Sequence, residues 1–132
     1  MIDIKRIRQQ PERFKKAARD KRFDVDIDKL LALDAEMLDA QRELQDIRTE
    51  QNAAGKTIAT LQGDEKQAAI ENMSRRKARA KELADRVGEI EPRFEELMLL
   101  VPQPPADEVP VGADDTENVE LRKVGQPPEF DF

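Results

Sequence analysis

The sequence predicts an all-α fold: a long antiparallel two-helix coiled-coil hairpin, with short N-terminal helices and an extended C-terminal tail. Of the 132 residues, 39% are charged and 38% hydrophobic, and the aromatic residues are five Phe. This composition favours long amphipathic helices over a thick globular core. Apolar residues also recur with heptad spacing over two long stretches, and a proline-rich stretch follows residue 101.

The N-terminal segment predicts two short helices within residues 3–20. Asp3 can cap the first helix, and Pro11 fits the first position of the second. Phe14 and Phe23 are large apolar side chains next to these helices. We expect them to pack against the base of the hairpin.

The first coiled-coil helix is predicted over 28–62. One heptad row is Leu30, Met37, Leu44, Gln51 and Ile58, and the other is Leu33, Ala40, Ile47, Ala54 and Leu61. Nine of these ten positions are apolar. Gly63 then suits the residue after a helix end, and Asp64 with Gln67 can form a capping box for the next helix.

The second coiled-coil helix is predicted over 65–100. One row is Met73, Ala80, Val87, Phe94 and Val101, and the other is Ala69, Arg76, Leu83, Ile90 and Leu97. Folding the chain back at 63–64 pairs heptad residues whose numbers sum to 127, including the two polar exceptions, Gln51 and Arg76. These two are predicted to form a polar layer that fixes the register. Pro92 predicts a kink or a break in this helix.

The C-terminal part, 102–132, changes character. "VPQPPADEVPVG" is too rich in proline for a helix and predicts an extended linker. Residues 118–124 alternate as a strand does. Phe130 and Phe132 then follow with no core of their own, as at the start of another packed domain. We therefore expect a helical arm over 1–101, and a linker with the first strand of an absent domain over 102–132.

Charge is unevenly distributed along the chain, whose net charge is −6. Residues 1–23 carry nine basic and three acidic side chains, and 24–47 carry two basic and eight acidic. The distal half of the hairpin, 48–86, carries nine basic and six acidic side chains. The base of the rod is therefore acidic and its distal half is basic.

The densest basic run is "SRRKARAK" at 74–81, which contains no acid. Like charges four residues apart repel in an isolated helix, so this density makes sense opposite a polyanion. A solvated helix face is the competing interpretation. Without Trp, Tyr or a distal Phe, a duplex backbone fits better than stacked single strands. The candidate RNA-contacting residues are Arg48, Lys56, Arg75, Lys77, Arg79 and Lys81.

The sequence also limits the chemistry. It has no His, no Cys and a single Ser, so it has no Ser-His or Cys-His nucleophile and no thiolate or imidazole metal site. "AAGKT" at 53–57 lacks the first glycine and the strand of a phosphate-binding loop. We expect no catalytic residue, metal or cofactor in this chain. No stretch is long enough to span a membrane and no signal peptide is evident, so a cytoplasmic location is expected.

Three stretches, "MIDIKRIRQQPERF", "FDVDIDKLLALD" and "VPVGADDTENVELRKVGQPPEFDF", together with the hairpin between them, resemble the N-terminal portion of bacterial-type seryl-tRNA synthetases. The resemblance implies a tRNA-binding arm that recognises the long variable arm of serine tRNA. It also implies that an absent class II catalytic domain attaches serine using ATP and Mg²⁺, and that the parent protein is a homodimer. Serine and ATP would bind only that absent domain.

Two alternatives to this function remain open. One is a structural or chaperone-like coiled-coil interaction hairpin, although such hairpins have apolar tips and this tip half is basic. The other is the arm of a synthetase-like paralogue without aminoacylation activity.

Overall fold

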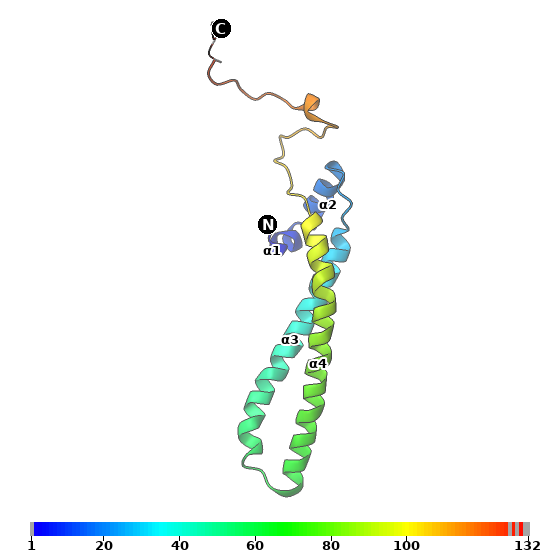
Figure 1. Cartoon of the computed structure of the whole chain (residues 1–132), viewed down its shortest axis with the longest axis vertical. Helices are drawn as coiled ribbons and strands as arrows, with labels where there is room; N and C mark the ends of the chain where they lie inside the picture. Colours follow the sequence, from blue (N-terminus) through cyan, green and yellow to red (C-terminus); the bar gives the residue numbers. More distant parts are fainter. Residues whose placement is uncertain (1, 127, 129, 131–132) are drawn as a thin grey trace.

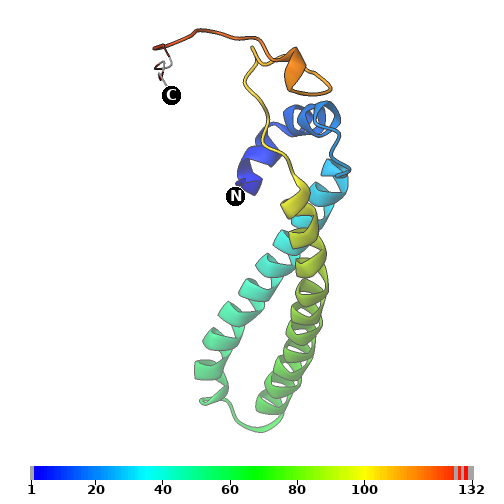
Figure 2. The same cartoon turned by 45° about the horizontal axis from the view of Figure 1, so that its top comes forward.

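The structure is a computed structural model that describes residues 2–126, 128 and 130, without the side chain of Lys56. Its elements are α1 (Ile4–Gln9), α2 (Pro11–Asp20), α3 (Ile27–Ile58), α4 (Gly63–Leu100) and a short 3-10 turn, η1 (Asp115–Glu117). The long helices α3 and α4 form a hairpin, and α1 and α2 lie at its open end (Figures 1 and 2). The predicted all-α hairpin is confirmed.

The two N-terminal helices begin where their capping residues predict. The carboxylate of Asp3 accepts a hydrogen bond of 2.8 Å from the backbone N–H of Lys5, and Pro11 is the first residue of α2. Ile7 and Phe14 are fully buried at the base of the rod. They share a core cluster with residues of α3 and with Val101, just after α4, so the two short helices are held by packing at the open end.

The heptad predicts which residues of the hairpin are shielded from water. Along α4, the residues that are not fully exposed are Met98 and the predicted heptad positions, namely Ala69, Met73, Arg76, Ala80, Leu83, Val87, Ile90, Phe94 and Leu97. A second core cluster contains both members of three predicted pairs: Ala40 and Val87, Leu44 and Leu83, and Ile47 and Ala80. Each of these pairs has numbers that sum to 127, as the predicted register requires.

The turn between the long helices differs from the prediction. Helix α3 ends at Ile58, four residues before the expected end, and α4 begins at Gly63, two residues before the expected start. The hydroxyl of Thr60 donates to the carbonyl of Thr57 at 2.7 Å, and such side-chain bonds compete with helix at this point. Gly63 has a positive φ of 59°, but Asp64 lies inside α4 and does not cap it.

Of the kink or break expected at Pro92, the break does not occur: α4 continues through this residue to Leu100. Pro92 has no N–H to donate to the carbonyl of Gly88, four residues earlier. Both residues are exposed. Water can therefore satisfy the carbonyl of Gly88, and the proline ring projects away from α3.

An ion pair between Arg8 and Asp34 links α1 to α3. Both oxygens of the Asp34 carboxylate accept from the Arg8 guanidinium, at 2.5 Å from Nε and 2.8 Å from the terminal nitrogen. Asp34 is only 3% exposed, so its charge is compensated almost entirely by this bidentate pair. The hydrogen bonds to Asp34 also raise the pKa of Arg8.

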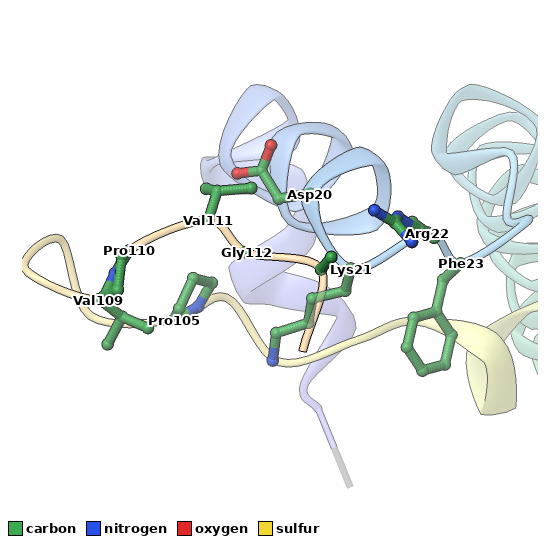
Figure 3. Close-up of a pocket in the computed structure, with 10 residues that line it drawn as sticks. Asp20, Lys21, Arg22, Phe23, Pro105, Val109, Pro110, Val111 and Gly112 are labelled. Carbon is green, nitrogen blue, oxygen red and sulfur yellow. The ribbon is translucent and has the colours of Figure 1, made fainter. Parts of the chain in front are cut away.

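After α4 the chain runs back along α2. Val101 and Pro102 are buried, and the ammonium of Lys21 donates to the carbonyl of Gln103 at 2.7 Å. An open hollow of about 330 Å³ lies between the end of α2 and the linker, bordered by Phe23 and Val111 (Figure 3). Phe23 is 49% exposed, so only Phe14 of the two N-terminal aromatics packs fully into the base.

The predicted strand at 118–124 does not form in the described part of the tail. Its alternating apolar residues Val119, Leu121 and Val124 are 67%, 83% and 82% exposed. A strand needs a neighbour for its backbone hydrogen bonds and for its apolar face, and no neighbouring strand lies beside this segment within the described residues. The prediction for Phe132 concerns a residue outside the described ones.

Candidate nucleic-acid interface

The basic run at 74–81 lies in the distal half of α4, toward the turn and away from α1 and α2 (Figure 1). The four predicted contact residues Arg75, Lys77, Arg79 and Lys81 are all exposed there. Arg48, on α3, is exposed as well. Exposure alone does not make these cations available to a ligand, because some already have acidic partners.

Arg79 joins the two helices. Its guanidinium donates two hydrogen bonds to the carboxylate of Glu43, at 2.7 and 2.9 Å, and a third of 3.1 Å to Glu82. The hydrogen bonds with Glu43 raise the pKa of Arg79, and they lower the pKa of Glu43. Arg79 therefore holds α4 to α3 and is not a free cation.

Two further ion pairs join the helices beside Arg79. Arg86 donates to Glu36 at 2.8 Å, and Arg76 pairs with Glu50. We call the three pairs the ion-pair face of the hairpin; its members are Glu36, Glu43 and Glu50 on α3, with Arg76, Arg79 and Arg86 on α4.

The hydrogen bonds of Arg76 differ from those of the predicted polar layer. Its guanidinium contacts Glu50 and the side chain of Asn72, at 3.2 Å, instead of Gln51. A carboxylate is a stronger acceptor for a guanidinium than an amide is, and Glu50 is one residue away from the expected partner. Arg76 thus reaches the side of the seam where the other ion pairs lie.

Three of the remaining predicted cations, Arg48, Lys77 and Lys81, lie on the opposite side of the seam. Each residue advances about 100° around a helix, so Lys77 lies about 200° from Arg79, and Lys81 follows Lys77 by one turn. On α3, Arg48 lies about 200° from Glu50 by the same rule. No ion pair among the described residues includes Arg48, Lys77 or Lys81.

Between 41 and 55 on α3 and between 63 and 84 on α4, this opposite side contains no acid; Asp85 follows one turn after Lys81. Its residues on α3 are Gln41, Gln45, Arg48, Asn52 and Gly55, and those on α4 are Gly63, Lys66, Ile70, Ser74, Lys77, Lys81 and Ala84. We call it the basic face, with Arg48, Lys66, Lys77 and Lys81 as its cations. Lys66 to Lys81 spans roughly 22 Å along the axis, at 1.5 Å per residue.

The predicted contact residues are therefore divided between two sides. Arg48, Lys77 and Lys81 share the basic face, whereas Arg75 lies one turn from Arg79 on the other side. The side chain of Lys56 lies outside the described part of the structure. Lys66 is not among the predicted contact residues because it stands outside the dense run, although its spacing of eleven residues from Lys77, close to three turns, places it on the same side.

Unpaired cations on such a face can neutralise a row of phosphates. Among the described side chains, no group of three or more His, Cys, Asp or Glu could hold a metal ion. In the same part of the chain, no helix has the length and apolar character needed to cross a membrane. Fold and charge together define a coiled-coil arm with one basic face.

Comparison with known proteins identifies the family to which this arm belongs. The family model for the seryl-tRNA synthetase N-terminal domain matches residues 1–105, so the chain belongs to that family. Serine–tRNA ligases from Pseudothermotoga lettingae and Symbiobacterium thermophilum are 36% and 34% identical over the whole of this chain. The match covers 32% of each of those proteins. The chain thus spans about a third of the length of these relatives.

Proposed function

We propose that this chain is the tRNA-binding arm of a serine–tRNA ligase, and that its basic face docks on a double-stranded part of serine tRNA. The observation that carries the proposal is the division of charge between the two sides of the distal hairpin. On one side three arginines are neutralised by Glu36, Glu43 and Glu50, and Arg75 beside them forms no ion pair among the described residues. On the other side, Arg48 and the three lysines form no ion pair among the described residues, and Asp85, one turn beyond Lys81, is the first acid past that face.

An RNA duplex is the ligand that this face fits best. The cations occupy an elongated helical surface without an aromatic side chain, since the five Phe lie outside residues 24–93. Single-stranded bases would require stacking platforms, whereas a duplex presents two phosphate rows that can be contacted by shape. The long variable arm of serine tRNA, implied by the family, is a duplex of this kind.

The activity of the longer protein follows from the family as part of the same proposal. A class II catalytic domain after the linker would attach serine to the tRNA, with ATP and Mg²⁺ bound in that domain. The protein would act in the cytoplasm as a homodimer. This chain would contribute affinity and selection of the tRNA, with no catalytic residue of its own.

Charge reversal on the basic face tests the proposal. The triple variant Arg48→Glu, Lys77→Glu and Lys81→Glu should bind a serine-tRNA variable-arm duplex at least tenfold more weakly at moderate salt. Its affinity should also depend less steeply on salt, because about two to three phosphate contacts are lost. Fluorescence anisotropy at salt concentrations from about 50 to about 200 mM measures both the affinity and its salt dependence.

A matched control separates the position of the charges from the net charge. Arg19, Lys29 and Arg93 are exposed, form no ion pair among the described residues and lie away from the distal half. Reversing these three to Glu changes the net charge by the same amount. Equal loss of affinity in both triple variants would reject the basic face as the docking surface.

A further inference from the structure

Burial along the hairpin decreases sharply toward the turn. Residues 51–75, which we call the distal tip, include no buried residue among the described side chains. The heptad positions of the tip are only half-buried: Gln51, Ala54, Ile58, Leu61, Ala69 and Met73. Ile70 is 44% exposed. In the rest of the hairpin, which we call the firm part, Ala40, Ile47, Leu83 and Ile90 are 3–6% exposed. Close packing between the helices therefore stops short of the tip.

The ion pairs between the helices stop at the same level. Arg86–Glu36 and Arg79–Glu43 lie in the firm part, and Arg76–Glu50 lies at the border of the tip. Within the tip, no ion pair between described residues joins α3 to α4. Neither apolar burial nor ion pairing therefore holds the α3 and α4 segments of the tip firmly together.

The helical segments of the tip are also short and contain poor helix formers. The α3 part extends only from 51 to Ile58, and the α4 part from Gly63 to 75. Both segments are the ends of longer helices, and helix ends fray where tertiary packing does not hold them. Gly55 lies inside the shorter segment, where a glycine disfavours helix relative to alanine.

We propose that the distal tip is open in a large fraction of free molecules, and that binding of an RNA duplex closes it into the paired arrangement. The proposal rests on the proposed function. Lys66 aligns with Lys77 on the basic face only while α4 is helical between them. A duplex that contacts both lysines therefore binds the closed tip more tightly than the open one, and it shifts the population toward closure.

The affinity for RNA should consequently rise when the tip is stabilised, without any added charge or contact. An added methyl group at Gly55 meets no atom within 4 Å, so Gly55→Ala raises helix propensity without a clash. It should lower the opening constant of the tip about fivefold. The affinity for the variable-arm duplex should rise about two- to fivefold, because apparent affinity scales with the population of the competent state.

Gly88→Ala is the matched control. Gly88 is also an exposed glycine inside a helix, and it too has no atom within 4 Å of an added Cβ, but it lies in the firm part of the hairpin. This variant should leave the affinity for RNA unchanged. Since Gly55 lies on the basic face, Thr57→Ala gives a second test from the other side of α3, with a smaller gain expected in the same direction.

Amide hydrogen exchange measures the opening itself. In the free chain, amides within 51–75 should exchange much faster than those within 30–47 and 80–97, and the duplex should slow them. Two results would overturn the proposal: equal protection of tip and firm part, or slower exchange in Gly55→Ala and Thr57→Ala with no gain in affinity. If the parent chain binds no duplex at all, the proposed function fails, whereas fast exchange of the free tip would still support its opening.

Discussion

At the scale of single residues, the pair Arg8–Asp34 connects the N-terminal segment to the rod. The carboxylate is 3% exposed and accepts both of its hydrogen bonds from one guanidinium. The helix that carries Arg8, α1, has only six residues and would not persist alone. The sequence contains no sign of this pair, because its members are 26 residues apart in different helices and follow no common period. Only the folded chain brings them together.

Removing the guanidinium should destabilise the protein. Arg8→Met leaves a buried carboxylate without a partner, which should lower the free energy of unfolding by about 2–3 kcal/mol. The effect is below that of a fully buried pair because the Arg8 side chain is 37% exposed. Urea unfolding followed by circular dichroism measures the change. The double variant Arg8→Met, Asp34→Leu should recover most of the loss, and failure to recover would contradict this account of the pair.

At the scale of elements, the two long helices show which features a sequence can predict. The heptad rows are a property of each helix alone, so the half-buried and buried positions of α4 could be predicted residue by residue. The ion-pair face could not, because it depends on which flanks of α3 and α4 meet. Arg79 illustrates the difference: by exposure and charge it is a candidate phosphate ligand, yet Glu43 occupies it in the folded hairpin.

The pair between Glu43 and Arg79 should make the stability of the hairpin depend on pH. The pKa of Glu43 lies below its ordinary value of 4.5 in the folded chain. Its contribution to stability is therefore fully present above about pH 4.5 and is lost as the pH falls through the lowered value. Glu43→Gln should melt at a lower temperature than the parent at neutral pH, and the two should converge in acid. Thermal melts from neutral pH down to acid test this; a constant difference would contradict it.

At the scale of the whole molecule, the predicted arm is correct in type, and its two ends differ in detail. The turn begins at Ala59 because Gly55, Thr57 and Thr60 are poor helix formers, a local effect that the apolar period at Ile58 and Leu61 conceals. The predicted strand at 118–124 is a strand only in the presence of a neighbour. The alternating pattern indicates that the segment can form a strand beside a partner strand, and the described fold provides no such neighbour.

The position of the firmest packing, far from the turn, has a consequence for how the chain folds. A hairpin would ordinarily close from its turn, where the contacting residues are near in sequence. Here Leu30 and Val101, about 70 residues apart, share a core cluster, whereas the tip buries little. Closing so long a loop costs only about 1.7 kcal/mol more than closing ten residues. Burial of each Leu, Ile or Phe side chain stabilises the fold by about 1.5–3 kcal/mol, so a few such residues at the open end offset this cost.

The rate-limiting step should therefore assemble the open end of the rod first, and the hairpin should close toward its turn. Leu30→Ala should slow refolding, whereas Met73→Ala should leave the refolding rate nearly unchanged and act, if at all, on unfolding. Stopped-flow refolding over a range of urea concentrations distinguishes the two variants. A slower refolding rate in Met73→Ala than in Leu30→Ala would mean that the chain closes from its turn. If Leu30→Ala refolds more slowly instead, the distal tip, which carries Lys66, is the last part of the arm to form.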